Sequence, residues 1–73
     1  MTPSVRYDAD SGLIYAEDEE GRIAAIAAER ITHVWHMPGQ PVCVHLDGAE
    51  WALMLMGGIT YEAVMAAWLE ARR

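Results

Sequence analysis

The sequence predicts an α+β domain: an antiparallel, mostly meandering β-sheet followed by one C-terminal α-helix packed on one face of the sheet. Two observations support this fold class. Short apolar runs follow one another through residues 5–56, and each ends at a cluster of turn-forming residues such as Gly, Pro and Asp. Residues 60–73 instead repeat apolar side chains at helical spacing. At 73 residues, the chain is predicted to form a single domain spanning residues 1–73.

Two hairpins are predicted in the N-terminal third of the chain. The turn at residues 8–12 (DADSG) separates the run 5–7 from the run 13–15. The turn at residues 18–21 (DEEG) then separates this second run from residues 22–26. A glycine ends each turn, and glycine readily adopts the positive φ that tight hairpin connections need.

Residues 24–30 are ambiguous between helix and strand. Their alanines, Glu29 and Arg30 are good helix formers. The β-branched and aromatic residues that follow are typical of a strand. We expect a strand that runs through Ile26, a short turn at residues 28–30, and a new strand from Ile31.

The next strands are residues 42–46, which alternate as a half-buried strand should, and residues 51–56. Between them, Asp47-Gly48 is the strongest turn signal. The second strand is apolar on both sides, with Trp51, Leu53 and Leu55 on one side and Ala52, Met54 and Met56 on the other. It is either a central strand covered on both faces or a strand whose methionine face meets another chain. The latter alternative predicts a homodimer through Met54 and Met56.

The C-terminal helix is predicted to begin at Thr60, whose hydroxyl can cap its first turn. A negative charge at Glu62 suits the positive end of the helix dipole. Ile59 and Val64 can form a hydrophobic staple across the cap. One face of the helix carries the apolar residues Tyr61, Val64, Met65, Trp68 and Leu69. We expect this face to pack across the sheet, with Trp68 in the core.

The charge of the chain is negative and unevenly distributed. It has five arginines, no lysine and a formal net charge of −6. Six of its eleven carboxylates lie within the first twenty residues: Asp8, Asp10, Glu17, Asp18, Glu19 and Glu20. Such a surface is unsuited to direct nucleic-acid binding, which needs clustered Lys and Arg. It favours docking onto a protein partner with a basic surface, and we expect the carboxylates to lie on solvated turns.

A cytoplasmic location is expected. The lone Cys43 fits a reducing compartment. The N-terminus lacks the apolar run of a signal peptide. The longest apolar-rich stretch, residues 51–56, is far shorter than a membrane span, so no membrane partner is expected.

Four potential metal ligands lie within thirteen residues: His33, His36, Cys43 and His45. Zinc accepts such ligands in a tetrahedron. His33 and His45 could face each other across a hairpin, and Cys43 shares a strand face with His45. His36 is three residues from His33, which puts the two on opposite faces of a strand. We therefore predict no metal site and no cofactor.

The sequence contains no catalytic signature. Cys43 lies between valines, without an orienting group or an oxyanion motif, so we predict that the protein is not an enzyme. Trp35 and Trp51 are candidate partner-binding anchors, because tryptophan is enriched among binding hot spots. We expect at least one of these two side chains to lie in the core.

The chain resembles two kinds of protein. Its acidic cluster and small size are similar in kind to phage-encoded inhibitors of bacterial defence, such as anti-CRISPR proteins. That resemblance implies an inhibitor that occupies a basic nucleic-acid site on its target. A second resemblance rests on residues 21–34, 42–48 and 60–64. Their order, which covers about two-thirds of the chain, resembles the layout of small flagellar proteins of the FlbD type.

These observations predict a non-enzymatic protein-binding module. The leading hypothesis is an inhibitor that docks through acidic residues onto a basic, nucleic-acid-handling bacterial protein. The alternative is a flagellar-type assembly or regulatory adaptor, and the third is a small His/Cys metal-binding protein. A homodimer is compatible with each of them.

Overall fold

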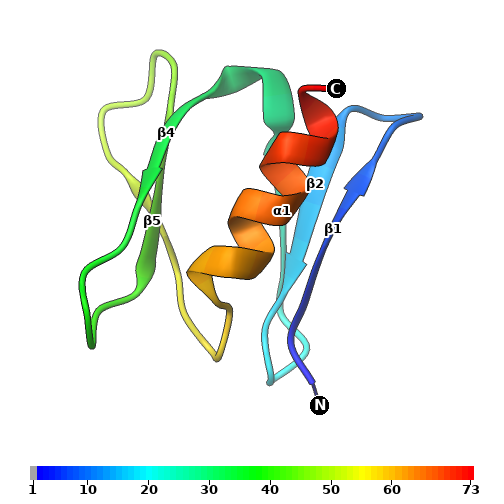
Figure 1. Ribbon diagram of the computed structural model, residues 1–73. Coiled ribbons are helices and arrows are strands. Elements are labelled where there is room, and N and C mark those ends of the chain that lie inside the picture. The colour runs from blue at the N-terminus through cyan, green and yellow to red at the C-terminus, as the bar shows by residue number, and fades with distance from the viewer. Residues whose placement is uncertain (1) are drawn as a thin grey trace.

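A computed structural model describes residues 2–73 of the chain (Figure 1). Its strands are β1 (Ser4–Asp8), β2 (Leu13–Glu17), β3 (Ile23–Ala27), β4 (Ile31–Trp35), β5 (Val42–Leu46) and β6 (Leu53–Leu55). A 3-10 turn, η1 (Ala28–Arg30), joins β3 to β4, and the helix α1 (Tyr61–Ala71) follows the last strand. No helix within residues 2–73 has the length and apolar character needed to cross a membrane.

The strands form two antiparallel three-stranded meanders, β1-β2-β3 and β4-β5-β6. The two sheets turn their inner faces toward each other, and α1 lies across the opening on one side of them (Figure 1). The predicted α+β class is therefore confirmed. The expected single sheet is divided in two, because the chain leaves the first sheet at η1.

The turn η1 forms the corner between the sheets, as expected for residues 28–30. Ala28 is buried there, and its N–H donates to the carbonyl of Gly12 at 3.1 Å. Arg30 binds the next hairpin. Its carbonyl accepts from the Asp47 N–H at 2.7 Å, and its Nη2 donates to the Asp47 carbonyl at 2.7 Å. The corner is therefore tied to a turn of each sheet.

The core is built from alternate residues of the strands and from one face of the helix. In the first sheet, the inward residues pair across strands, as Ile14 does with Ile26. In the second sheet, Val42 and Val44 alternate inward with Leu55 opposite. The buried apolar residues are Ile14, Ala16, Ile26, Ala28, Ile31, Val42, Val44, Leu55, Val64 and Ala67.

The helix begins as predicted, with the Thr60 hydroxyl accepting a hydrogen bond from the Ala63 N–H at 3.2 Å. It packs chiefly along β1 and buries Val64 and Ala67. Trp68 packs against the core but stays partly exposed, with the Arg72 guanidinium carbon 5.2 Å from the centroid of its ring. The prediction that Leu69 belongs to the packed face of the helix was wrong, because Leu69 is exposed. The face that packs on the core runs through Ala67 and Ala71 instead.

The strand predicted at residues 51–56 is shorter than expected. Only Leu53–Leu55 form β6, and it lies at the edge of its sheet. The interpretation of a central strand covered on both faces was therefore wrong. Leu55 is buried, whereas Met54 on the opposite side is 58% exposed.

A close contact joins the β2–β3 turn to the segment after β6. The Glu19 N–H donates to the carbonyl of Gly57 at 2.9 Å. Gly57 has a φ of +75°, and a Cβ atom added to it would lie 2.5 Å from Cβ of Asp18. Only glycine allows this approach, because any side chain would push the two sheets apart.

The first prediction is that Gly57→Ala lowers the free energy of unfolding more than Gly39→Ala does. Gly39 is a matched control, since its φ is +78° but no atom of residues 2–73 lies within 4 Å of the added Cβ. The control should cost about 1–2 kcal/mol for its left-handed backbone. Gly57→Ala should cost about 1–3 kcal/mol more because of overpacking against Asp18. Urea denaturation measures both, and equal losses would contradict the contact.

Candidate functional site

The most distinctive surface of the protein is the solvent-facing side of the second sheet. Alternation along the strands places five side chains there, which we call the outer face: His33, Trp35, Cys43, His45 and Met54. The register pairs His33 with His45, and it pairs Cys43 with both Trp35 and Met54. The opposite sides of the same strands supply the core, so the outer face has a rigid support.

Stacked rings run along part of the outer face. The His33 ring lies between His45, at 4.9 Å between centroids, and Trp35, at 5.0 Å. The Thr32 hydroxyl contacts Nδ1 of His45 at 2.7 Å and Nδ1 of His33 at 3.2 Å, and it donates to the His45 carbonyl at 3.1 Å. One hydroxyl thus contacts both rings and the backbone of the strand that carries His45. The rings are thus held in one arrangement.

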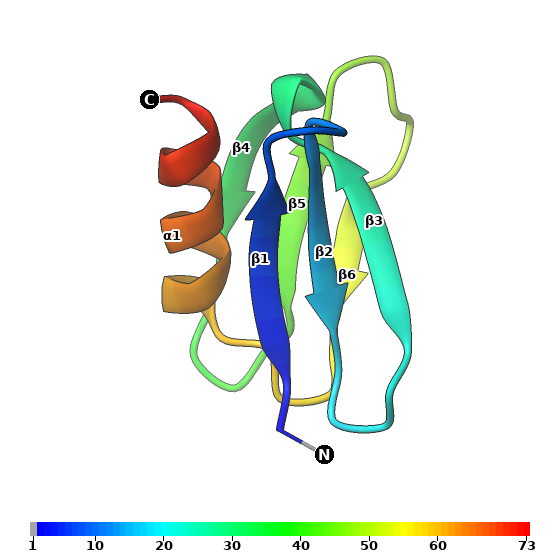
Figure 2. The same ribbon diagram turned by 90° about the vertical axis from the view of Figure 1, so that its right-hand side faces the viewer.

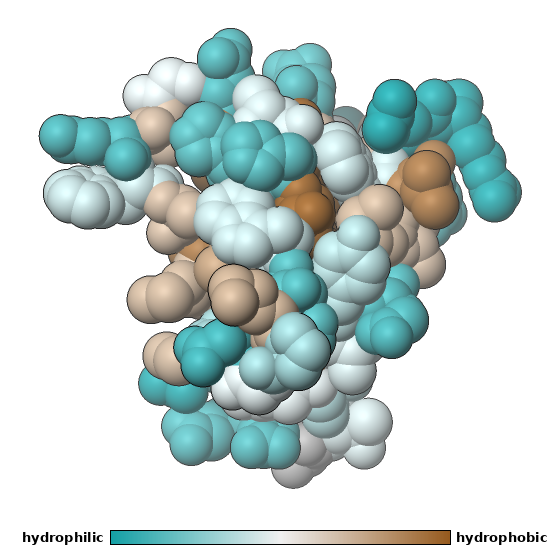
Figure 3. Space-filling model, turned by 60° about the vertical axis from the view of Figure 1, so that its left-hand side comes forward, coloured by the Kyte–Doolittle hydropathy of each residue, from teal (hydrophilic) through white to brown (hydrophobic). Residues whose placement is uncertain are grey.

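The rest of the outer face is apolar and open to solvent. Trp35 is 37% exposed, and it lines a shallow hollow of about 140 Å³ with Met37, Gln40, Pro41, Cys43 and Met54. Met54 also borders a second groove, together with Met56 and Ile23. Figure 3 shows apolar residues across the middle of this side of the molecule, with hydrophilic residues above and below them. The apolar surface is therefore continuous from Trp35 to Met56.

The sequence did not point to Thr32 or Met37 as parts of this surface. For Met37 a signal exists, because the alternation of His33 and Trp35 continues to residue 37. For Thr32 no comparable signal exists. A register shift between Ile31 and His33 brings its hydroxyl to the histidine pair, and a bulge of this kind depends on the partner strand.

Trp51 lies apart from the strand that was predicted to contain it. It belongs to the loop between β5 and β6 and is 80% exposed. Because Trp35 is also exposed, the expectation that one of these two side chains lies in the core was wrong. Both remain accessible as anchors for a partner.

The acidic residues divide into two groups at opposite ends of the first sheet. Asp8 ends β1 and Asp10 lies in the β1–β2 connection, whereas Glu17 ends β2 and residues 18–20 lie in the β2–β3 connection (Figure 2). The length of β2, about 17 Å, separates the groups. Asp8 is engaged locally, since Oδ1 accepts from the Asp10 N–H at 3.2 Å and Oδ2 accepts from the Ser11 hydroxyl at 2.8 Å. The six carboxylates therefore form no single surface.

Asp18 corrects the expectation that all these carboxylates lie on solvated turns, because it is only 6% exposed. Its Oδ1 accepts from the N–H groups of Glu20 and Arg22, both at 2.9 Å. Its Oδ2 accepts from Nε of Arg22 at 2.8 Å. These hydrogen bonds close the β2–β3 turn around the Asp18 carboxylate, and the carboxylate is therefore buried.

The environment of Asp18 favours its ionised form. Burial acts in the opposite direction and raises its pKa. The hydrogen bonds from the Arg22 backbone, the Arg22 side chain and the Glu20 backbone, together with the charge of Arg22, outweigh burial and lower the pKa below the ordinary 3.8. The same hydrogen bond raises the pKa of Arg22.

The histidines and the cysteine do not gather into one ligand set. His33 faces His45, as expected, whereas the His36 ring lies 6.1 Å from that of Tyr61. The Cys43 thiol points to the carbonyl of Pro41 at 3.7 Å. Among residues 2–73, no group of three or more His, Cys, Asp or Glu side chains is placed to hold a metal ion.

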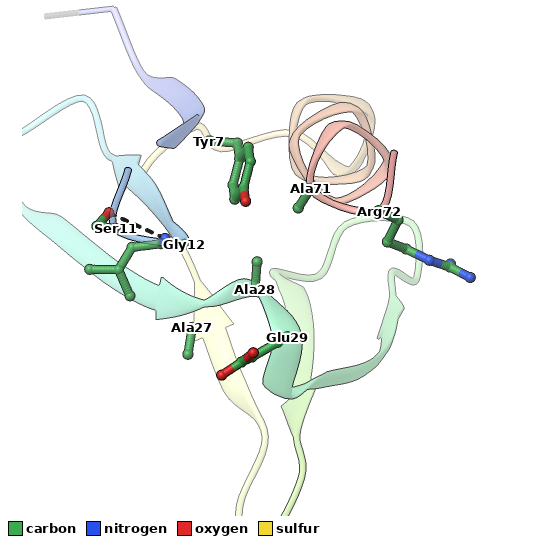
Figure 4. A pocket seen from close by; sticks show the side chains of 9 residues that line it. Tyr7, Ser11, Gly12, Ala27, Ala28, Glu29, Ala71 and Arg72 are labelled. Carbon is green, nitrogen blue, oxygen red and sulfur yellow. Dashed lines mark hydrogen bonds between the residues drawn. The ribbon is translucent and has the colours of Figure 1, made fainter. Parts of the chain in front are cut away.

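A cavity of about 320 Å³ lies between the end of α1 and the β1–β2 turn. Figure 4 shows Tyr7 pointing into it between Ala71 and Ala28, with the Arg72 side chain directed away. The Ser11 hydroxyl on its wall already donates to Asp8 and accepts from the Leu13 N–H at 3.3 Å. The Ser11 hydroxyl thus serves the hairpin turn.

Comparisons of the chain with protein-family models, with curated proteins and with solved structures find no match. The function must therefore be inferred from the geometry of the chain itself.

The second prediction concerns the pH dependence of stability. The pKa of Asp18 is lower in the folded chain than in the unfolded chain, so folding favours the ionised form. Its contribution to stability is complete above its ordinary, unfolded-state pKa of 3.8 and is lost as pH falls through the lower folded-state pKa. Asp18→Asn should be less stable at neutral pH, because its amide would direct N–H groups at other donors.

Urea denaturation of both proteins between about pH 7 and pH 2 provides the measurement. The stability difference between wild type and Asp18→Asn should shrink as the pH falls below about 4. A difference that stays constant over this range would show that the ionised carboxylate is not the stabilising group.

Proposed function

We propose that this protein is a non-enzymatic protein-binding module that docks through the outer face. The observation that carries the proposal is the continuous exposed surface around Trp35 and Met54 on a hydrogen-bonded sheet. Exposed apolar patches on small proteins are typical of interaction sites. An aromatic side chain with methionines is the composition that protein interfaces favour.

Preorganisation supports the same proposal. The Trp35 ring is stacked on His33, and His33 is held by His45 and Thr32. A side chain that is already fixed loses little conformational entropy when a partner covers it. Met37 and Met54 beside it are flexible and can adapt to the shape of a partner.

The negative charge supports a partner with a basic surface. The net charge is −6, and Asp10, Glu19 and Glu20 are exposed. The acidic groups lie at the two ends of the first sheet, whereas the outer face belongs to the second sheet. The acidic groups therefore attract the partner from a distance and speed association. The narrower proposal is an inhibitor of the anti-CRISPR kind, which covers the nucleic-acid site of a bacterial protein.

A flagellar-type adaptor is the second candidate, because β4 and β5 lie in the segments whose layout resembles the FlbD type. It would use the same outer face. The identity of the retained protein separates the two candidates: a nucleic-acid-handling protein supports the inhibitor, and a flagellar protein supports the adaptor.

The third prediction is that the double substitution Trp35→Ala with Met54→Ala abolishes partner capture while the chain stays folded. Both side chains are on the solvent side of the sheet, so the core is not disturbed. Immobilised wild type and variant are exposed to bacterial lysate, and retained proteins are identified by mass spectrometry. The affinity for a protein retained by wild type should fall about 30-fold or more, corresponding to about 2 kcal/mol.

Leu69→Ala is the matched control, since Leu69 is an exposed apolar residue on α1, away from the second sheet. It should retain the same proteins as wild type. Capture that survives the double substitution would refute docking through the outer face. In a second arm, Asp10→Lys with Glu20→Lys should slow association and weaken its salt dependence. Asp18 is left unchanged there because it supports the fold.

A further inference from the structure

The two sheets have four edge strands, and three of them are protected against pairing. The helix α1 packs along β1. The strand β4 has a register shift between Ile31 and His33, and β6 has only three residues. Short strands, bulges and covering helices are the ways in which proteins prevent edge-to-edge association. The fourth edge, β3, has none of these features.

The strand β3 has five residues, no charge, no proline and a regular register with β2. Nothing pairs with its other side within residues 2–73, and Figure 2 shows β3 at the open edge of its sheet. Its Ile23 side chain is 60% exposed. A regular and uncharged edge of this kind is a template for another strand.

The hydrogen bonds at the two ends of β3 show which of its backbone groups are unpaired. The Asp18 N–H donates to the Arg22 carbonyl at 2.9 Å, and the Ala28 N–H donates to the Gly12 carbonyl at 3.1 Å. In an antiparallel pair, hydrogen-bonded positions alternate. Residues 24 and 26 therefore bond to β2. The N–H and C=O groups of Ile23, Ala25 and Ala27 point away from β2, toward the open edge.

We propose that this edge is a homodimer interface, in which β3 pairs antiparallel with β3 of a second copy about a two-fold axis at Ala25. In this register, Ala25 lies opposite Ala25 of the second copy, and Ile23 lies opposite Ala27. These three positions are the ones whose backbone groups are unpaired, so each pair exchanges two hydrogen bonds. A large residue faces a small one on either side of the axis. The two first sheets then form one continuous sheet.

A second copy fits this edge for two further reasons. The pairing is self-complementary, which is what a two-fold interface requires. A groove of about 240 Å³ runs beside β3 and is lined by Ile23, Met54 and Met56. A strand added to β3 would shield the side of this groove that carries Ile23 and Met56, and Met56 is one of the two methionines that the sequence predicts at a dimer contact. The interface leaves Trp35 on the outer face accessible to a different partner.

The fourth prediction tests the register through Ala25, whose exposed side chain lies beside the axis. Wild type should show twice the monomer mass of 8.1 kDa by light scattering at high micromolar concentration. Ala25→Lys places two like charges opposite each other and should raise the dimer Kd by about 100-fold. Mixing Ala25→Lys with Ala25→Glu should restore the dimer, because opposite charges then meet at the axis.

Ala66→Lys is the matched control, since Ala66 is an exposed alanine of α1; it should remain dimeric. Amide exchange gives a residue-level readout: the N–H groups of Ile23, Ala25 and Ala27 should be protected in wild type and should exchange rapidly in Ala25→Lys. A monomeric wild type, or an Ala25→Lys protein that stays dimeric, would overturn the proposal. Ala25→Lys should still capture the outer-face partner, which separates this interface from the proposed function.

Discussion

The arrangement of the two sheets depends on the buried carboxylate of Asp18. It is the one buried ionisable side chain in the part of the chain that the structure describes, and three hydrogen bonds satisfy it. A buried charge is tolerated only when it is paired and hydrogen-bonded, and Arg22 supplies both conditions. The turn that Asp18 closes packs against Gly57, which leads from β6 toward α1. The interaction thus fixes the first sheet to the second at the end opposite the η1 corner.

This constraint also explains how the molecule divides its surface. The corner η1 joins the sheets at one end, the Asp18–Gly57 contact joins them at the other, and α1 fills the opening beside β1. No element within residues 2–73 covers the side between β3 and β6, and a groove remains there. Small domains bury a smaller fraction of their surface than large ones do. The uncovered edge and the uncovered outer face are therefore the places where other chains can add burial.

In the proposed function, the two sheets have different roles, which correspond to the distribution of charge and apolar surface. Carboxylates lie at the two ends of the first sheet, whereas the second sheet carries aromatic rings and methionines on its solvent side. Long-range attraction needs only net charge, but a tight contact needs side chains that can be fully desolvated. The acidic turns supply the charge for attraction, and the outer face supplies side chains that a partner can desolvate.

Local patterns were sufficient to predict most elements from the sequence. The turns at residues 8–12 and 18–21, the corner at 28–30 and the Thr60 cap depend on residues close together in the chain, and all are present. The sequence also allowed His33 to face His45 across a hairpin, and the register has this pairing. Only the tertiary structure decided that Asp18 is buried, that Trp51 lies in a loop, and that the strands form two sheets with β3 at a free edge. Apolar residues that recur at every second position show which side chains share a face of a strand. Burial of that face, however, depends on contacts between residues far apart in the chain.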